Sequence, residues 1–308
     1  MSQPIKTVLQ GLYARPYFLL ISTMAMWGGH TAVSRLAVGE ISPASLTFLR
    51  WLAVSGIMLA ISRQGLRQYW PQIKPRLGYF TAMGTLGFTA YNILLYWAAH
   101  TTTAINIGII NAAMPAMIFI GALAMFRQPV RPLQWIGLLV SSAGVIVTAA
   151  KGEWATLLTL SVNRGDIQIL IAVILYAGYS VLLRNRPLLP SLVFFALLAF
   201  AALASSLIPL AIEIAAGEFF LPSWKGWLLL LFVVIFPSLL SQIFYIRGVE
   251  LIGPGRAGLF SNVVPLFSTG FAMLILGEKL AMFHIVALVL VLGGIFLAEW
   301  RPNAKGAA

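Results

Sequence analysis

Apolar runs of about twenty residues recur along the whole of this 308-residue chain. A run of that length crosses the hydrocarbon core of a bilayer, about 30 Å thick, as one α-helix. The chain is 60% hydrophobic and only 9% charged, whereas an ordinary globular domain is about 25% charged. These values exclude a disordered chain and a soluble enzyme. They predict an all-α polytopic membrane protein that resides in a lipid bilayer.

Ten transmembrane helices are predicted when the apolar runs are divided at Pro, Gly and charge clusters. The predicted spans are residues 17–37, 43–62, 77–98, 104–126, 132–150, 166–184, 190–212, 225–247, 254–276 and 280–299. The connecting loops are short, and none is long enough to hold a soluble catalytic domain. We therefore expect the function to lie inside the membrane.

The net charge of +12 is interpreted as a topology signal. With a cytoplasmic N-terminus, the inner segments carry fourteen of the twenty Lys and Arg residues, the outer segments carry five, and Arg50 lies within a span. This distribution predicts that both termini are cytoplasmic. It also removes the reason to expect a nucleic acid partner.

An internal repeat is indicated by residues 91–149, which align without a gap with residues 241–299 at an offset of 150. Pairs at this offset are Gly87 with Pro237, Asn92 with Gln242, Gly108 with Gly258, Pro115 with Pro265 and Gly144 with Gly294. The alignment predicts two halves, 1–150 and 151–308. Each half has five helices, an odd number, so the halves should be inverted across the membrane, an arrangement typical of transporters.

Four residues near the middle of predicted spans are candidates for gating kinks: Gly87, Pro115, Pro237 and Pro265. A proline inside a helix frees a backbone carbonyl and bends the helix axis. Because the four form two pairs at equal depth, we expect kinks around a central cavity.

Aromatic residues are predicted to lie at the same depth. Trp27 and His30 are three residues apart on one helix face, and Tyr176 and Tyr179 repeat this spacing in the second half. Mid-span placement argues against an interfacial aromatic belt. The four residues are predicted to line a substrate cavity, and the alternative is packing in the core.

Polar residues on the third, fourth, eighth and ninth spans should face the protein interior, because unpaired polar groups in lipid are costly. The predicted substrate-binding set adds Asn92, Tyr96, Asn111, Gln242, Tyr245 and Asn262 to the four residues above, and Asn106, Ser241 and Ser261 are further polar candidates. Some of them are expected to serve as interhelical ties instead.

Arg50 is the one charged residue well inside a predicted span, and no Asp or Glu lies at that depth. Three partners are open for it: backbone carbonyls, an edge carboxylate such as Glu40, or the carboxylate of a substrate. Proton-coupled carriers usually relay protons through Asp, Glu or His. His30 is then the remaining central candidate for such a relay.

Motifs for enzymatic chemistry are missing from the sequence. There is no cysteine, no P-loop, no Gly-x-Ser-x-Gly elbow and no metal-ligand cluster. We therefore expect no catalytic residues, no cofactor and no metal. Small residues in the fifth and tenth spans, including Gly137 and Gly294, could form a homodimer seam or pack internally.

Several short motifs together resemble the drug/metabolite transporter superfamily. They are Trp27-Gly28 in the first span, Ser42-Pro43 followed by Phe48-Leu49-Arg50-Trp51, Gly277-Glu278-Lys279-Leu280 before the last span, and Gly293-Gly294 within it. The layout of two five-helix EamA-type repeats fits over nearly the whole chain, although residues 127–130 depart from the pattern. The aromatic residues near the midplane are most similar to those of YddG-type aromatic amino acid exporters.

The resemblance implies a cavity lined by helices 1–4 and 6–9. It also implies a multi-pass protein of the bacterial inner membrane. The leading hypothesis is a secondary transporter that exports aromatic or hydrophobic amino acids, or related small metabolites, by alternating access. The alternatives are a multidrug exporter of lipophilic cations and a membrane-embedded enzyme.

Overall fold

The structure is a computed structural model that describes residues 11–99, 101–102, 107, 110–127, 129–150, 152–153, 155, 158, 163–276 and 281–300. Within these ranges all regular secondary structure is helical, and each of the ten predicted spans contains helix. The predicted all-α membrane fold is confirmed. Of the predicted site residues, only the further candidate Asn106 lies outside the described ranges.

The first half contains single-helix spans and one composite span. Its elements are α2 (Pro16–Leu36), α3 (Pro43–Gln68), α4 (Trp70–Ile73), η1 (Lys74–Arg76), α5 (Leu77–Gly84), η2 (Thr85–Ala90), α6 (Tyr91–Ala99), α8 (Met114–Phe126) and α9 (Pro132–Ala149). Proline stands in the first turn of α2, α3 and α9, where its missing N–H leaves no hydrogen bond unmade. The third predicted span is α5, η2 and α6 in series.

The second half repeats this order. Its elements are α11 (Arg164–Leu182), η3 (Leu183–Asn185), α12 (Ser191–Ala215), α13 (Trp224–Val233), η4 (Val234–Leu240), α14 (Ser241–Ile252), α15 (Pro254–Leu259), η5 (Phe260–Val263), α16 (Val264–Leu276) and α17 (Met282–Glu299). The eighth predicted span is α13, η4 and α14. By length and composition, six helical stretches among the described residues could each cross a membrane.

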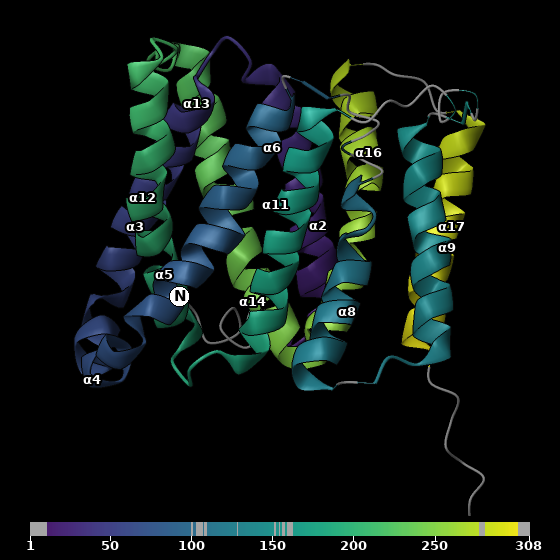
Figure 1. Ribbon diagram of the computed structural model, residues 1–308, viewed down its shortest axis with the longest axis horizontal. Coiled ribbons are helices and arrows are strands. Elements are labelled where there is room, and N and C mark those ends of the chain that lie inside the picture. Colours follow the sequence, from purple (N-terminus) through teal and green to yellow (C-terminus); the bar gives the residue numbers. More distant parts are fainter. Residues whose placement is uncertain are drawn as a thin grey trace, which may run out of the picture.

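Helix pairing follows an approximate two-fold pattern. The first helix of the first half, α2, packs on α14 and α16 of the second half. Its counterpart in the second half, α11, packs on α6 and α8 of the first half. The second-span helices α3 and α12 pair with each other, as do the fifth- and tenth-span helices α9 and α17. Figure 1 shows α3 with α12 at one edge of the molecule and α9 with α17 at the other. Each main helix contact made by one half therefore has an equivalent contact made by the other half.

The four predicted kink positions coincide with breaks in regular α-helix. Gly87 lies in η2 and Pro237 in η4, and both segments are π-helical. Pro115 lies in the first turn of α8, directly after a non-helical turn at residues 112–113. Pro265 is the second residue of α16 and follows the 3-10 segment η5. The sequence indicated the positions of these breaks but not their π-helical form.

Small residues bring α9 and α17 into close contact. A Cβ placed on Gly137 would lie 2.3 Å from the carbonyl oxygen of Gly294, and one on Gly144 would lie 2.8 Å from the Val291 side chain. The structure therefore uses these glycines for packing within one chain, the second of the two interpretations given above.

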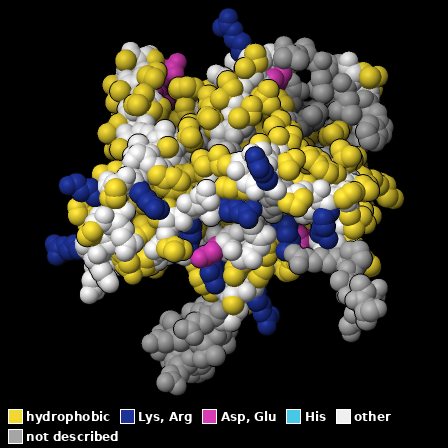
Figure 2. Space-filling view, turned by 60° about the horizontal axis from the view of Figure 1, so that its bottom comes forward, with side chains coloured by type: hydrophobic (Ala, Val, Ile, Leu, Met, Phe, Trp, Pro, Cys, Tyr) yellow, Lys and Arg dark blue, Asp and Glu magenta, His cyan; other side chains and the backbone are white. Residues whose placement is uncertain are grey.

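Basic side chains gather at one end of the molecule. Figure 2 shows Lys and Arg concentrated on the end that carries α4, while hydrophobic side chains cover the flanks. Arg63 and Arg67, in the last turns of α3, are exposed at this end. The flanks are apolar because lipid, rather than water, is the solvent there.

Candidate functional site

Four aromatic side chains from four helices meet in the middle of the molecule. We call Trp27 (α2), Tyr91 (α6), Tyr176 (α11) and Tyr245 (α14) the aromatic cluster. The Trp27 ring lies 5.8 Å from that of Tyr176 at 82° and 5.2 Å from that of Tyr245. Tyr176 lies 5.1 Å from Tyr91 and 6.1 Å from Tyr245. Each half of the chain contributes two of the four rings.

The edge of the cluster carries polar groups. The Trp27 indole donates to the Ser241 hydroxyl at 2.9 Å, and Ser241 in turn donates to the carbonyl of Pro237 at 2.6 Å. The first contact joins α2 to α14, and the second uses a carbonyl at the π-helical break. The Tyr245 hydroxyl is paired with Ser180 at 3.0 Å.

Other polar atoms at the cluster have no partner. The Tyr176 and Tyr179 hydroxyls and Gln242 Oε1 are buried without a hydrogen bond in the described structure. A buried polar atom left unpaired costs about 1–3 kcal/mol, so such atoms in a native protein need an explanation. These three atoms are therefore hydrogen-bonding groups that the helices themselves leave unpaired.

A second group of rings extends the cluster toward α3. Tyr179 is 5.3 Å from both Tyr176 and Phe88, and Phe88 stacks on Trp51 at 4.8 Å. The Tyr179 ring also lies against Gly87, where a Cβ would be only 2.5 Å from it. Because Gly87 has no Cβ, the ring can lie directly against the backbone of η2 in the third span.

A polar group lies beside these rings. His30 Nε2 is 3.2 Å from the Tyr96 hydroxyl, which links α2 to α6. Arg50 donates to Asn92 Oδ1 at 3.2 Å and is also hydrogen-bonded to Tyr96. The Asn92 amide donates to the carbonyl of Phe88 at 2.5 Å.

Seven of the ten predicted binding residues lie in the aromatic cluster, the second group of rings or the polar group: Trp27, His30, Asn92, Tyr96, Tyr176, Tyr179 and Tyr245. Asn111 touches their edge, because its Oδ1 accepts from the Tyr91 hydroxyl at 3.4 Å. Gln242 is buried on α14, one turn before Tyr245. Asn262 lies elsewhere: its amide donates to Ser141 at 2.9 Å and to Ser142 on α9, so it ties η5 to α9. Sequence reasoning missed Tyr91 and Phe88, although the mid-span position of both was a usable signal.

Glu40 does not pair with Arg50, which corrects one of the three expectations for that residue. The Glu40 carboxylate accepts from the Ser223 hydroxyl and from Lys225 Nζ at 3.1 Å, tying the turn after α2 to the start of α13. These hydrogen bonds hold the pKa of the Glu40 carboxyl below its usual value. Two other acids also act at helix ends: Glu213 accepts from the Ala44 N–H at 2.9 Å, and Asp166, in the first turn of α11, accepts from the N–H of the N-cap residue Asn163 at 2.9 Å.

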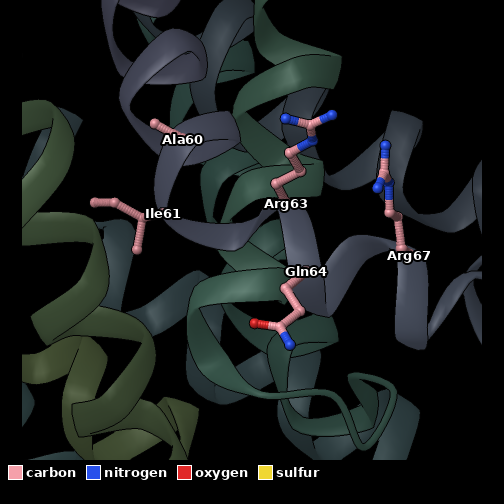
Figure 3. Close-up of a pocket in the computed structure, with 5 residues that line it drawn as sticks. All are labelled: Ala60, Ile61, Arg63, Gln64 and Arg67. Atoms are coloured by element: carbon pink, nitrogen blue, oxygen red, sulfur yellow. The ribbon is translucent and has the colours of Figure 1, made fainter.

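Metal-binding groups are not found in the part of the chain that the structure describes, where no three His, Asp or Glu residues come together. An open pocket of about 510 Å³ lies away from the aromatic cluster, near the basic end of α3. Figure 3 shows Ala60, Ile61, Arg63, Gln64 and Arg67 around it. These side chains are all exposed, and the pocket has no aromatic wall.

Comparison with known families gives one match that covers both halves. The EamA-like transporter family matches residues 14–150 and residues 163–300. Similar curated proteins also extend over almost the whole chain. The uncharacterized transporter YetK of Bacillus subtilis is 25% identical over 298 residues, 95% of this chain and 90% of that protein.

Another similar protein is the uncharacterized inner membrane transporter YedA of Escherichia coli K12. It is 26% identical over 294 residues, 92% of each chain. A solved structure described as "Crystal structure of protein" has a TM-score of 0.75 at 18% identity, over 92% of this chain and 96% of that one. At that identity the likeness shows a shared fold.

Proposed function

The chain belongs to the EamA-like transporter family, and on that premise we propose that it exports aromatic and other hydrophobic amino acids, or related small metabolites. The family and the named relatives are transporters, so the chain is a multi-pass membrane transporter and not an enzyme. The substrate class and the direction of transport are our proposal.

The aromatic cluster is the observation that carries this proposal. Its rings are arranged edge-on or tilted, with centroids 5.1–6.1 Å apart, so a substrate ring can replace one of these contacts with a similar one. The unpaired Tyr176 hydroxyl and Gln242 Oε1 supply hydrogen bonds for amino or carboxyl groups. Mostly aromatic walls with a few placed polar groups are typical of sites for small organic ligands.

Lipophilic cations are a poorer match to this site. Exporters of such cations generally place a buried carboxylate opposite the cation, and aromatic faces substitute for that carboxylate only in part. The buried charge beside the rings is positive, Arg50. The buried carboxylates of Glu213 and Asp166 lie at helix ends, where each accepts from a backbone N–H. The electrostatics therefore favour a substrate that carries a carboxylate.

Alternating access is supported by the pairing of helices between the halves. We propose that residues 1–150 and 151–308 are the two inverted repeats, and that the breaks at Gly87, Pro115, Pro237 and Pro265 act as hinges. Two arrangements of comparable stability, both able to bind substrate, are sufficient for transport down a gradient. A buried carboxylate relay is not part of this scheme.

Charge and the relatives support a proposal for the type of membrane and for the orientation of the chain. We propose a bacterial inner membrane, because YedA is named an inner membrane transporter. The basic end with Arg63 and Arg67 would face the cytoplasm, together with both termini.

The proposal is tested by counterflow in proteoliposomes that are loaded with unlabelled phenylalanine. Uptake of labelled phenylalanine should occur without a pH gradient. Trp27→Ala should raise the half-saturating concentration about 2- to 13-fold, because one aromatic pair is worth about 0.5–1.5 kcal/mol. Trp227→Ala is the matched control, since Trp227 is exposed on α13. Absence of counterflow for all aromatic amino acids would contradict the proposal. So would a Trp27→Ala protein whose half-saturating concentration equals that of the wild type.

A further inference from the structure

Arg50 is a buried cation about two turns from the start of α3, and the structure shows no neutralising partner for it. Its side chain is 2% exposed, and the salt bridges among the described residues all involve other groups. A buried guanidinium needs a counter-charge or a full set of hydrogen bonds to offset its lost hydration. Arg50 has neither, because its Nε is without a hydrogen-bond partner.

The groups that hold Arg50 are neutral. Asn92 accepts from one terminal nitrogen at 3.2 Å, Tyr96 supplies a further hydrogen bond, and the guanidinium lies 5.0 Å from the centre of the Trp51 ring. These contacts fix the direction of the guanidinium and leave its charge uncompensated. An arginine fixed in this way is preorganised for bidentate pairing with a carboxylate.

Arg50 is also connected to the aromatic cluster. Tyr96 touches both Arg50 and His30, and His30 lies one helical turn from Trp27 on α2. Asn92, the other partner, follows Tyr91 of the cluster directly in α6. Arg50 and the aromatic cluster are thus joined by residues that neighbour both. Such an arrangement suits a single ligand that has a charged end and an apolar end.

We propose that Arg50 binds the carboxylate of the transported substrate, so the site takes aromatic or apolar carboxylates and rejects their neutral or cationic analogues. This inference rests on the proposed function and narrows its substrate class. It also explains why a cation with no counter-charge is kept in the span: the substrate supplies the counter-charge while it is bound.

Two ligands that differ only at the carboxyl group test this proposal. Binding of L-phenylalanine and of L-phenylalaninamide to the purified full-length protein is measured by calorimetry. The wild type should bind the acid about 10- to 100-fold more tightly, the usual effect of a hydrogen bond to a charged group. In Arg50→Gln the two ligands should bind within a few-fold of each other. Arg63→Gln, which changes an exposed arginine of the same helix, should keep the full preference.

Thermal unfolding without ligand separates this role from a structural one. If Arg50 is retained for binding, Arg50→Gln should unfold at the same temperature as the wild type or higher, because an uncompensated charge is removed. An Arg50→Gln protein that keeps the preference for the acid would overturn the proposal. If that variant fails to fold, the proposal is also overturned. Comparing the acid with the amide on the wild-type protein requires no variant. If the wild type binds the two ligands equally, the role of Arg50 is overturned and the proposed function is not. Failure of both ligands to bind would contradict the proposed function as well.

Discussion

Substituting Gly87 with alanine should displace a tyrosine of the candidate site. The Cβ of the new alanine would lie 2.5 Å from the Cγ and Cδ2 atoms of Tyr179, whereas carbon atoms in contact are normally about 3.5–4.0 Å apart. The Tyr179 ring must therefore move by about 1 Å or more. It is fully buried and already in ring contact with Phe88 and Tyr176, so it cannot turn aside freely.

The expected free-energy change follows from two opposing effects. Overpacking of a buried site destabilises by about 1–3 kcal/mol, and alanine gains about 0.8–1.0 kcal/mol over glycine in helix propensity. Gly87→Ala should therefore be destabilised by up to about 2 kcal/mol. Gly178→Ala is the matched control: Gly178 precedes Tyr179 in α11, and a Cβ there has no atom within 4 Å. That variant should be neutral or slightly stabilised.

Thermal unfolding in detergent and phenylalanine counterflow provide the two measurements. Gly87→Ala should unfold at a lower temperature than Gly178→Ala and should bind substrate more weakly, because the shifted ring disturbs Tyr176. If the two variants unfold and transport alike, the close contact between Gly87 and Tyr179 does not shape the site, and the reasoning is refuted.

Three further results are expected. Gly137→Leu should separate α9 from α17 and lower the free energy of unfolding by about 1–3 kcal/mol in denaturant unfolding. Gly293→Leu is the control, because a Cβ at Gly293 has no atom within 4 Å, and it should leave stability unchanged. Equal effects of the two substitutions would contradict the close contact between α9 and α17. The pKa of the Glu40 carboxyl is lowered on folding, so its stabilisation of the turn after α2 is present above its usual pKa and is lost as pH falls through the depressed value. Limited proteolysis of that turn should therefore increase on acidification in the wild type and depend less on pH in Glu40→Gln, and identical pH profiles would count against the tie. Single cysteines at Gln64 and Glu218, both exposed, should be labelled from the cytoplasmic and the outer side respectively, and reversed labelling would overturn the topology.

The fold was largely predictable from the sequence, because bilayer thickness sets the length of each apolar run. The offset of 150 also placed Gly87 opposite Pro237, and both proved to lie in irregular helix. The π-helical form was not predictable. Propensity and periodicity describe α-helix and strand, whereas a π turn depends on what packs against the segment, here Tyr179 against η2.

The candidate site was predictable at the level of depth and residue type. Trp27 and Tyr176 were identified from their positions in matching spans, and they are in ring contact. The direction of a side chain was harder to predict, because rotation by one residue moves it about 100° around the helix. For this reason Asn262, which lies at the depth expected for the site, points away from it and bonds to Ser141 on α9. Tyr91, which does join the cluster, was overlooked for the same reason. The partner of Arg50 was also missed, because Asn92 on α6 comes close to α3 only through tertiary packing.

The position of a bound substrate tests the central claim most directly. Electron cryomicroscopy of the protein in nanodiscs with saturating phenylalanine would locate the ring and the carboxylate. We predict density for the ring against Trp27 and Tyr176, with the carboxylate directed toward Arg50. Density for the ligand only at a place away from these residues, such as the exposed pocket at the basic end of α3, would contradict the account.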